Sequence, residues 1–229
     1  MTPSQTLRVM PREMRLMSER ILSLTALPKG FALMITDVVM YSQAMGLGGF
    51  PLLEARLPDL MEATPTPLAL MAEVGDRLVL DAGGQHAWIA LPSALDLLEL
   101  TLAQHDSARI EVTGATDAAE LAIAEGLGAR HGLEVSLSGT TLTATRGPVA
   151  DPVLTRVLQD GARIEAAQWW RIYELAQTAL TPDSVVSRRH AGVNIVTEDG
   201  QIIGRTDNDD DTDPNFINSV GLKTQEATQ

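Results

Sequence analysis

The spacing of apolar residues changes near Pro65, and this change constrains the fold more than any other feature of the chain. Before it, apolar residues recur every three or four positions, the period of a helix that buries one face, as in Leu7, Met10, Met14, Met17, Ile21 and Leu24. Residues 31–45 repeat the pattern, and residues 51–62 indicate a shorter helix kinked by Pro58. We therefore expect residues 1–64 to form a helical portion.

After Pro65, strand and helix patterns alternate. The predicted elements are strands at 77–80 and 87–90, a helix from Pro92 to Ala103, a strand at 108–112, a helix at 117–129, and a hairpin of strands 133–137 and 141–145. Two helices, 151–160 and 166–179, follow, and then a hairpin within 193–204 that turns at Glu198-Asp199-Gly200. This order predicts a small mixed sheet flanked by helices.

The fold class that we expect is therefore α/β, or α+β, with an N-terminal helical portion, the mixed sheet, and a C-terminal helix and hairpin. Residues 1–64 and 65–205 should form one compact domain. Closely spaced aspartates follow Thr206, and such a run repels itself and has little to bury. We expect residues 206–229 to be a flexible acidic tail.

Charge and composition exclude several partners and chemistries. Lys and Arg number 17 against 30 Asp and Glu, and the net charge of -13 would repel nucleic acid and anionic membrane surfaces. The chain has no cysteine, which excludes disulfides, thiolate nucleophiles and cysteine-ligated metals. No apolar run long enough to cross a membrane and no secretory leader is apparent, so a cytoplasmic location is expected.

The histidines and glycines indicate no cofactor or metal. His86, His105, His131 and His190 are scattered, without the four-residue spacing that places two imidazoles on one metal, so we predict no metal site. The glycines of the 126–132 segment lie at the end of a predicted helix, whereas a dinucleotide-binding loop must open one. The cofactor is left unknown.

The densest polar segment begins after the helix at 166–179. Ser187, Arg188 and His190 lie close together there, and Asp207 follows at some distance. Arginine can bind a carboxylate or phosphate through two parallel hydrogen bonds, so these residues predict a site for a small anion. The alternative is a loop whose arginines pair with the surplus carboxylates of the chain. Since Trp169 and Trp170 are adjacent on a helix, one should be buried, and Trp170 could border a pocket or an interface.

The C-terminal third resembles an uncharacterised bacterial family, domain of unknown function 3726. The residues that carry the resemblance are Trp169-Trp170, Leu175-Ala176, Pro182-x-Ser184-x-x-Ser187-Arg188, Ala191-Gly192 and Thr206-Asp207-Asn208-Asp209. The family implies no established activity. The chain departs from its pattern at Val185, where members carry glutamate, at Leu33-Met34, where they carry an acidic pair, and by the hairpin within 193–204. These departures imply that any shared acid–base chemistry has been lost.

A fainter resemblance is to the malate/lactate dehydrogenase family that lacks a Rossmann fold. It rests on the N-terminal helical pair, the turn Gly46-Leu47-Gly48-Gly49 and the later β-α-β unit. That family places a histidine beside glycine in the turn, and this chain has none there, so the resemblance implies kinship of fold only.

Three functions follow from these patterns. The first is binding of a small anionic metabolite in bacterial catabolism through Ser187, Arg188, His190 and Asp207, with catalytic turnover left open. The second is a non-catalytic subunit that associates through Trp170 and the N-terminal helices with a second copy of the chain or with a metabolic enzyme. The third is a degenerate oxidoreductase.

Overall fold

The computed structural model describes residues 5–180 and two short strands, β8 (Ile195–Val196) and β9 (Ile202–Ile203). The chain divides into two units, Met1–Ala179 and Leu180–Gln229. In the second unit β8 pairs with β9 antiparallel, Ile195 opposite Ile203, as predicted for the hairpin within 193–204. The predicted acidic tail lies outside the described residues.

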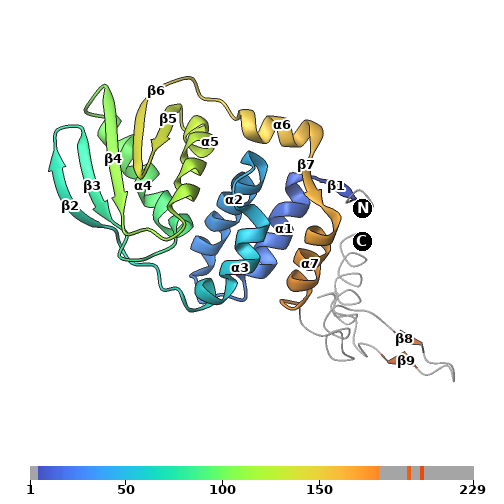
Figure 1. Cartoon of the computed structure of the whole chain (residues 1–229). Helices are drawn as coiled ribbons and strands as arrows, with labels where there is room; N and C mark the ends of the chain where they lie inside the picture. The colour runs from blue at the N-terminus through green and yellow to red at the C-terminus, as the bar shows by residue number, and fades with distance from the viewer. Residues whose placement is uncertain (1–4, 181–194, 197–201, 204–229) are drawn as a thin grey trace, which may run out of the picture. The chain divides into compact units, whose positions relative to one another are not determined.

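Three helices follow one another in the N-terminal part of the chain (Figure 1). They are α1 (Pro11–Leu22), α2 (Lys29–Met45) and α3 (Gly49–Glu62), with Pro58 inside α3. Met14 and Ile21 of α1 and Ile35 and Val39 of α2 are fully buried, because residues three or four apart lie on one helix face. This face forms one side of the core.

The larger sheet has five strands in the order β2-β3-β4-β6-β5, with only β3 and β4 parallel. The strands are β2 (Ala69–Val74), β3 (Arg77–Asp81), β4 (Ser107–Thr113), β5 (Leu133–Ser138) and β6 (Thr141–Arg146). The helix α4 (Ala87–Leu102) connects the two parallel strands. A parallel pair needs such a crossover, whereas the antiparallel pairs β2-β3 and β5-β6 are each joined by a turn.

One face of this sheet meets the helices. Leu78, Ile110 and Leu142 are consecutive cross-strand partners, and all three are buried toward α4 and α5 (Ile123–Arg130). Arg109 and Glu111 alternate with the buried residues of β4 and are exposed. The sheet therefore has one apolar face against the helices and one polar face. The α/β fold class is confirmed.

A second, two-stranded sheet joins distant parts of the chain. β1 (Thr6–Val9) pairs antiparallel with β7 (Ala162–Glu165), which lies between α6 (Pro152–Asp160) and α7 (Ala166–Gln177). Val9, Ala162 and Ile164 face the core, so Arg8 and Arg163 face outward.

Two predictions about these elements are wrong, and two strands were missed. Residues 6–9 form a strand, although their apolar spacing continues that of α1. Residues 87–90 are the first turn of α4, which continues through Pro92. Strands β2 and β7 were not predicted, because both depend on partners that the local sequence does not reveal.

Candidate functional site

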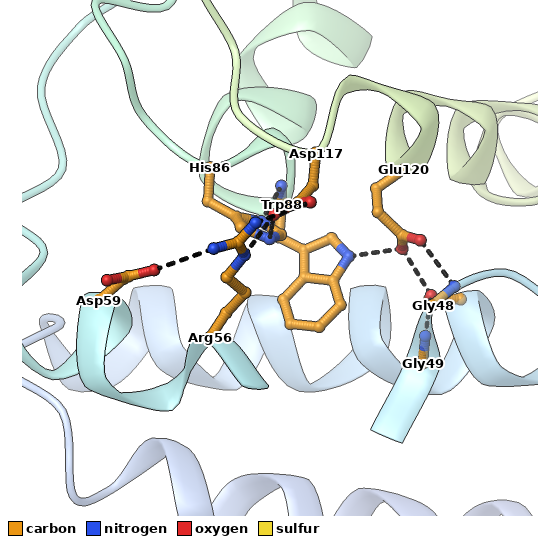
Figure 2. Close-up of polar contacts among 9 residues, drawn as sticks. Gly48, Gly49, Arg56, Asp59, His86, Trp88, Asp117 and Glu120 are labelled. Atoms are coloured by element: carbon orange, nitrogen blue, oxygen red, sulfur yellow. Dashed lines mark hydrogen bonds and ion pairs between the residues drawn. The ribbon is translucent and has the colours of Figure 1, made fainter. Parts of the chain in front are cut away.

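A buried polar network joins the turn between α2 and α3 to α4 and the 3-10 helix η1 (Ala118–Ala122) (Figure 2). At its centre is Glu120, which is only 4% exposed. Its carboxylate accepts hydrogen bonds from Ser42 Oγ at 2.5 Å, the Gly48 amide at 2.7 Å and Trp88 Nε1 at 2.8 Å. Three donors around one carboxylate compensate for its removal from water.

The same network accepts hydrogen bonds from the backbone amides at the start of α3. Besides Gly48, the amide of Gly49 donates to Ser42 Oγ at 2.7 Å, and that of Phe50 donates to Gln43 Oε1 at 2.9 Å. Free amides at a helix N-terminus are a ready site for an anion. Here side chains of the chain itself bind them, so the glycine turn is a structural junction.

A second part of the network surrounds His86 at the start of α4. Its Nδ1 accepts a hydrogen bond from the Trp88 amide at 3.1 Å, and its Nε2 lies 3.2 Å from Oδ2 of Asp117, in poor hydrogen-bonding geometry. The Nε of Arg56 binds the same oxygen of Asp117 at 2.8 Å. Both imidazole nitrogens are therefore directed at groups of the protein, and Nε2 is buried without a hydrogen-bond partner.

Charge and backbone geometry fit this structural role. Burial lowers the pKa of His86 below its ordinary value despite the nearby carboxylates, and the hydrogen bond from Arg56 lowers the pKa of Asp117. The imidazole is thus neutral and the carboxylate ionised near neutral pH. Asp117 has a φ of 51°, and among the described residues it is the only non-glycine with positive φ. Such a conformation costs about 1–3 kcal/mol, which the contacts to Arg56 and His86 offset.

Replacing His86 with asparagine should flatten the dependence of stability on pH. Because the pKa of His86 is lowered in the folded state, the unfolded chain binds the proton more readily below about pH 6.5, so stability is lost as the pH falls through that value. Asparagine can still cap α4 but does not titrate. Urea unfolding between about pH 7.5 and 5.5 should show a smaller loss for His86→Asn than for the wild type. Equal losses would contradict the burial effect.

A different site gathers three positively charged side chains. Arg8 of β1, Arg156 of α6 and Arg163 of β7 line a surface groove of about 550 Å³, here called the arginine groove, whose other walls include Gln43, Gly46 and Asp160. Arg8 and Arg163 are direct cross-strand partners, so two positive charges stand opposite each other. Arg156 donates a hydrogen bond to the backbone oxygen of Ala44 near the end of α2.

The electrostatics of the arginine groove favour an anion. Within residues 5–180, none of its three arginines forms an ion pair, although the chain carries a net charge of -13. Asp160 is the one carboxylate among the described lining residues. Like charges placed directly opposite on adjacent strands destabilise a sheet, and an anion between them would remove that repulsion.

The structure describes only some of the site residues that the sequence predicted. Ser187, Arg188, His190 and Asp207 lie outside the described residues, so their proposed role stays a prediction. Trp169 is 8% exposed and packs edge-on against Phe50, whereas Trp170 is 53% exposed and contacts Tyr173, which confirms that one indole is buried and the other is not.

Other observations limit the chemistry of the described part. Asp37 of α2 forms ion pairs with Arg15 at 2.6 Å and with Arg130 at 3.1 Å, so its carboxylate is bound by two cations of the chain. Within the described ranges, no three His, Asp or Glu side chains converge as a metal site would require. None of the helices described there is both long and apolar enough to span a membrane.

The likenesses to known proteins concern the fold alone. No protein-family model and no curated protein sequence matches the chain, so the resemblance to domain of unknown function 3726 stays a prediction. Malate dehydrogenase from Pyrococcus horikoshii is similar at 11% identity and a TM-score of 0.47, over 76% of this chain and 66% of that one. A putative malate/lactate dehydrogenase from E. coli is similar at 12% identity and a TM-score of 0.44, over 76% and 67%.

Malate dehydrogenase from Entamoeba histolytica shows 13% identity and a TM-score of 0.44 over 57% of this chain, which covers only 38% of that enzyme. These structures are of the malate/lactate dehydrogenase type, as the fainter sequence resemblance indicated. At such low identity no residue role transfers from them.

Proposed function

We propose that the chain binds a small anionic metabolite, a carboxylate or a phosphate ester, in the arginine groove. The observation that carries this proposal is the cross-strand pair of Arg8 and Arg163, neither of which has a carboxylate partner among the described residues. The two arginines repel each other in the free protein, and a bound anion would remove this repulsion. Binding of the anion would therefore stabilise the folded chain.

The three arginines have different roles in this proposal. Arg8 and Arg163 bind the anion from two strands, and each guanidinium can offer two parallel donors to a carboxylate or phosphate. Arg156 approaches from α6, where its bond to the Ala44 oxygen orients it and leaves other donors for the ligand. A groove of about 550 Å³ is within the usual size range for small-molecule sites.

The proposal is tested with citrate and inorganic phosphate as probes. Wild type should unfold at a higher temperature with either anion than with chloride at equal ionic strength, because a ligand that binds only the folded state stabilises it. Arg163→Gln should weaken citrate binding about tenfold or more in titration calorimetry. Without a multivalent anion the same variant should be as stable as the wild type or more so by about 0.2–1 kcal/mol, since it removes a like-charge pair.

The matched control is Arg146→Gln, an equal charge change at an exposed arginine of β6 that does not line the groove. It should leave citrate binding unchanged. Equal binding by Arg163→Gln and wild type would remove the arginine groove as the site. If Arg188→Gln alone abolished binding, the segment of Ser187, Arg188, His190 and Asp207 would take its place.

A non-catalytic interaction subunit is the second candidate function. It is supported by the exposed aromatic pair Trp170 and Tyr173 on α7, since exposed tryptophan is enriched at protein interfaces. The partner would be a second copy of the chain or a metabolic enzyme. A degenerate oxidoreductase is the third candidate function, suggested by the sequence resemblance to malate/lactate dehydrogenases, with which the chain shares a likeness of fold at low identity. The glycine turn gives it no anion site, because its amides are bound by Glu120, Ser42 and Gln43.

A further inference from the structure

Strand β2 is an exposed edge of the five-stranded sheet (Figure 1). All six of its residues are exposed, and three are large and apolar, with Met71 at 63% and Leu70 and Val74 also largely accessible. From Thr64 to Val74 the chain has one charged residue, Glu73. Proteins usually blunt such edges with several charges, because an unpaired strand invites pairing with another.

A groove of about 360 Å³ runs between β2 and α4, and we call it the leucine groove. Its walls combine Leu68, Leu70, Leu78, Leu80, Leu97 and Leu100 with the polar residues Glu73, Thr101, Gln104 and His105. Leu70 and Glu73 face it because they pair with the inward residues Leu80 and Leu78 of β3. Leu100 is 59% exposed, so α4 covers the centre of the sheet but does not shield β2.

We propose that β2 pairs antiparallel with β2 of a second copy of this chain, so that the two sheets become continuous. A two-fold axis perpendicular to the sheet relates two identical antiparallel strands and keeps both helical layers on the same side. The two leucine grooves then face each other across the axis. The pairing satisfies the outer backbone groups of β2, and the grooves bury Leu70 and Leu100 of both copies.

The sparse charge of β2 makes it a face on which two like-charged copies can meet. Two chains of net charge -13 repel each other over most of their surfaces, but β2 contributes one carboxylate per copy. In a register centred between Met71 and Ala72, Glu73 lies opposite Leu70 of the other copy and not opposite itself. A bulge lies between Leu70 and Ala72, and the extra twist of a bulge limits the paired length to β2.

The test is sedimentation equilibrium of the full chain with matched lysine substitutions. Wild type should have a mass about twice 24.6 kDa at concentrations near 100 µM, as for a dimer with a roughly micromolar Kd. Met71→Lys and Leu100→Lys should each shift the Kd at least about tenfold, because a dimer carries every substitution twice. Both positions are exposed in one copy, so unfolding temperatures should stay close to that of the wild type.

The controls distinguish this face from other apolar surfaces. Leu33→Lys, at an exposed leucine of α2, should leave the dimer intact. Hydrogen exchange gives an independent readout, because the amides of residues 69–74 should gain protection as the concentration rises. A monomeric wild type would overturn the proposal. So would a dimer that Trp170→Ala dissociates and the two β2-face variants do not, since this would place the interface on α7.

Discussion

Replacing Glu120 with alanine is expected to lower the free energy of unfolding by about 3–5 kcal/mol. The substitution leaves Trp88 Nε1, Ser42 Oγ and the Gly48 amide without their acceptor in a buried setting, and each buried donor without a partner costs about 1–3 kcal/mol unless water reaches it. Urea unfolding monitored by tryptophan fluorescence measures the loss. Trp88 also reports on the site directly.

Two further variants sharpen this test. Glu111→Ala removes an exposed carboxylate from β4 and should change stability by no more than about 0.5 kcal/mol. Glu120→Gln keeps the shape but turns one acceptor into a donor, which would face a donor of the protein, so an intermediate loss is expected. A loss of under about 1 kcal/mol for Glu120→Ala would show that water or another side chain replaces the carboxylate.

The helical part of the fold could be predicted because its cause is local. The residues of α1 and α2 that bury one face recur with the helical period, and Gly46, with a φ of 77°, ends α2 as a glycine can. The strands at 108–112, 133–137 and 141–145 were predicted for the same reason, since they alternate between buried and exposed positions. In these segments the local pattern agrees with the tertiary environment.

The start of α4 could not be predicted in this way. Trp88 and Ile89 favour a strand by residue type, but His86 caps a helix there through its imidazole, although histidine is not a usual capping residue. Strand β2 has no β-branched residue before Val74, and its pairing with β3 decides its conformation. In both segments tertiary contacts override the local preference.

The sites depend on still longer-range relations. Glu120 lies in the sequence Ala-Ala-Glu-Leu-Ala, which is typical of an exposed helix face, and only the approach of the glycine turn and Trp88 makes it buried. Arg8 and Arg163 lie near the two ends of the first unit, and the register of β1 against β7 places them together. The register of these two strands cannot be read from one sequence, so no local pattern predicted the arginine groove.

The second large effect is expected at Gly49, where alanine should destabilise the protein by about 2–5 kcal/mol. Gly49 has a φ of 48°, and a β-carbon there would lie against Oε1 of Gln43 and 2.8 Å from its backbone Cα. The matched control is Gly46→Ala in the same turn. Gly46 also has positive φ but has nothing within 4 Å of a β-carbon, so only the conformational cost of about 1–2 kcal/mol applies.

A double-mutant cycle separates the two sources of strain at Gly49. Gln43→Ala removes the side-chain amide that a β-carbon at Gly49 would meet, but it keeps the backbone Cα and also removes the bond to the Phe50 amide. The losses from Gly49→Ala and Gln43→Ala should therefore be less than additive, by about 0.5–3 kcal/mol in urea unfolding. Strict additivity would mean that the amide of Gln43 moves away at no cost. The side-chain part of the steric prediction would then fail, and the loss at Gly49 should exceed that at Gly46 only through the contact with the backbone Cα of Gln43, because both glycines share the constraint of positive φ.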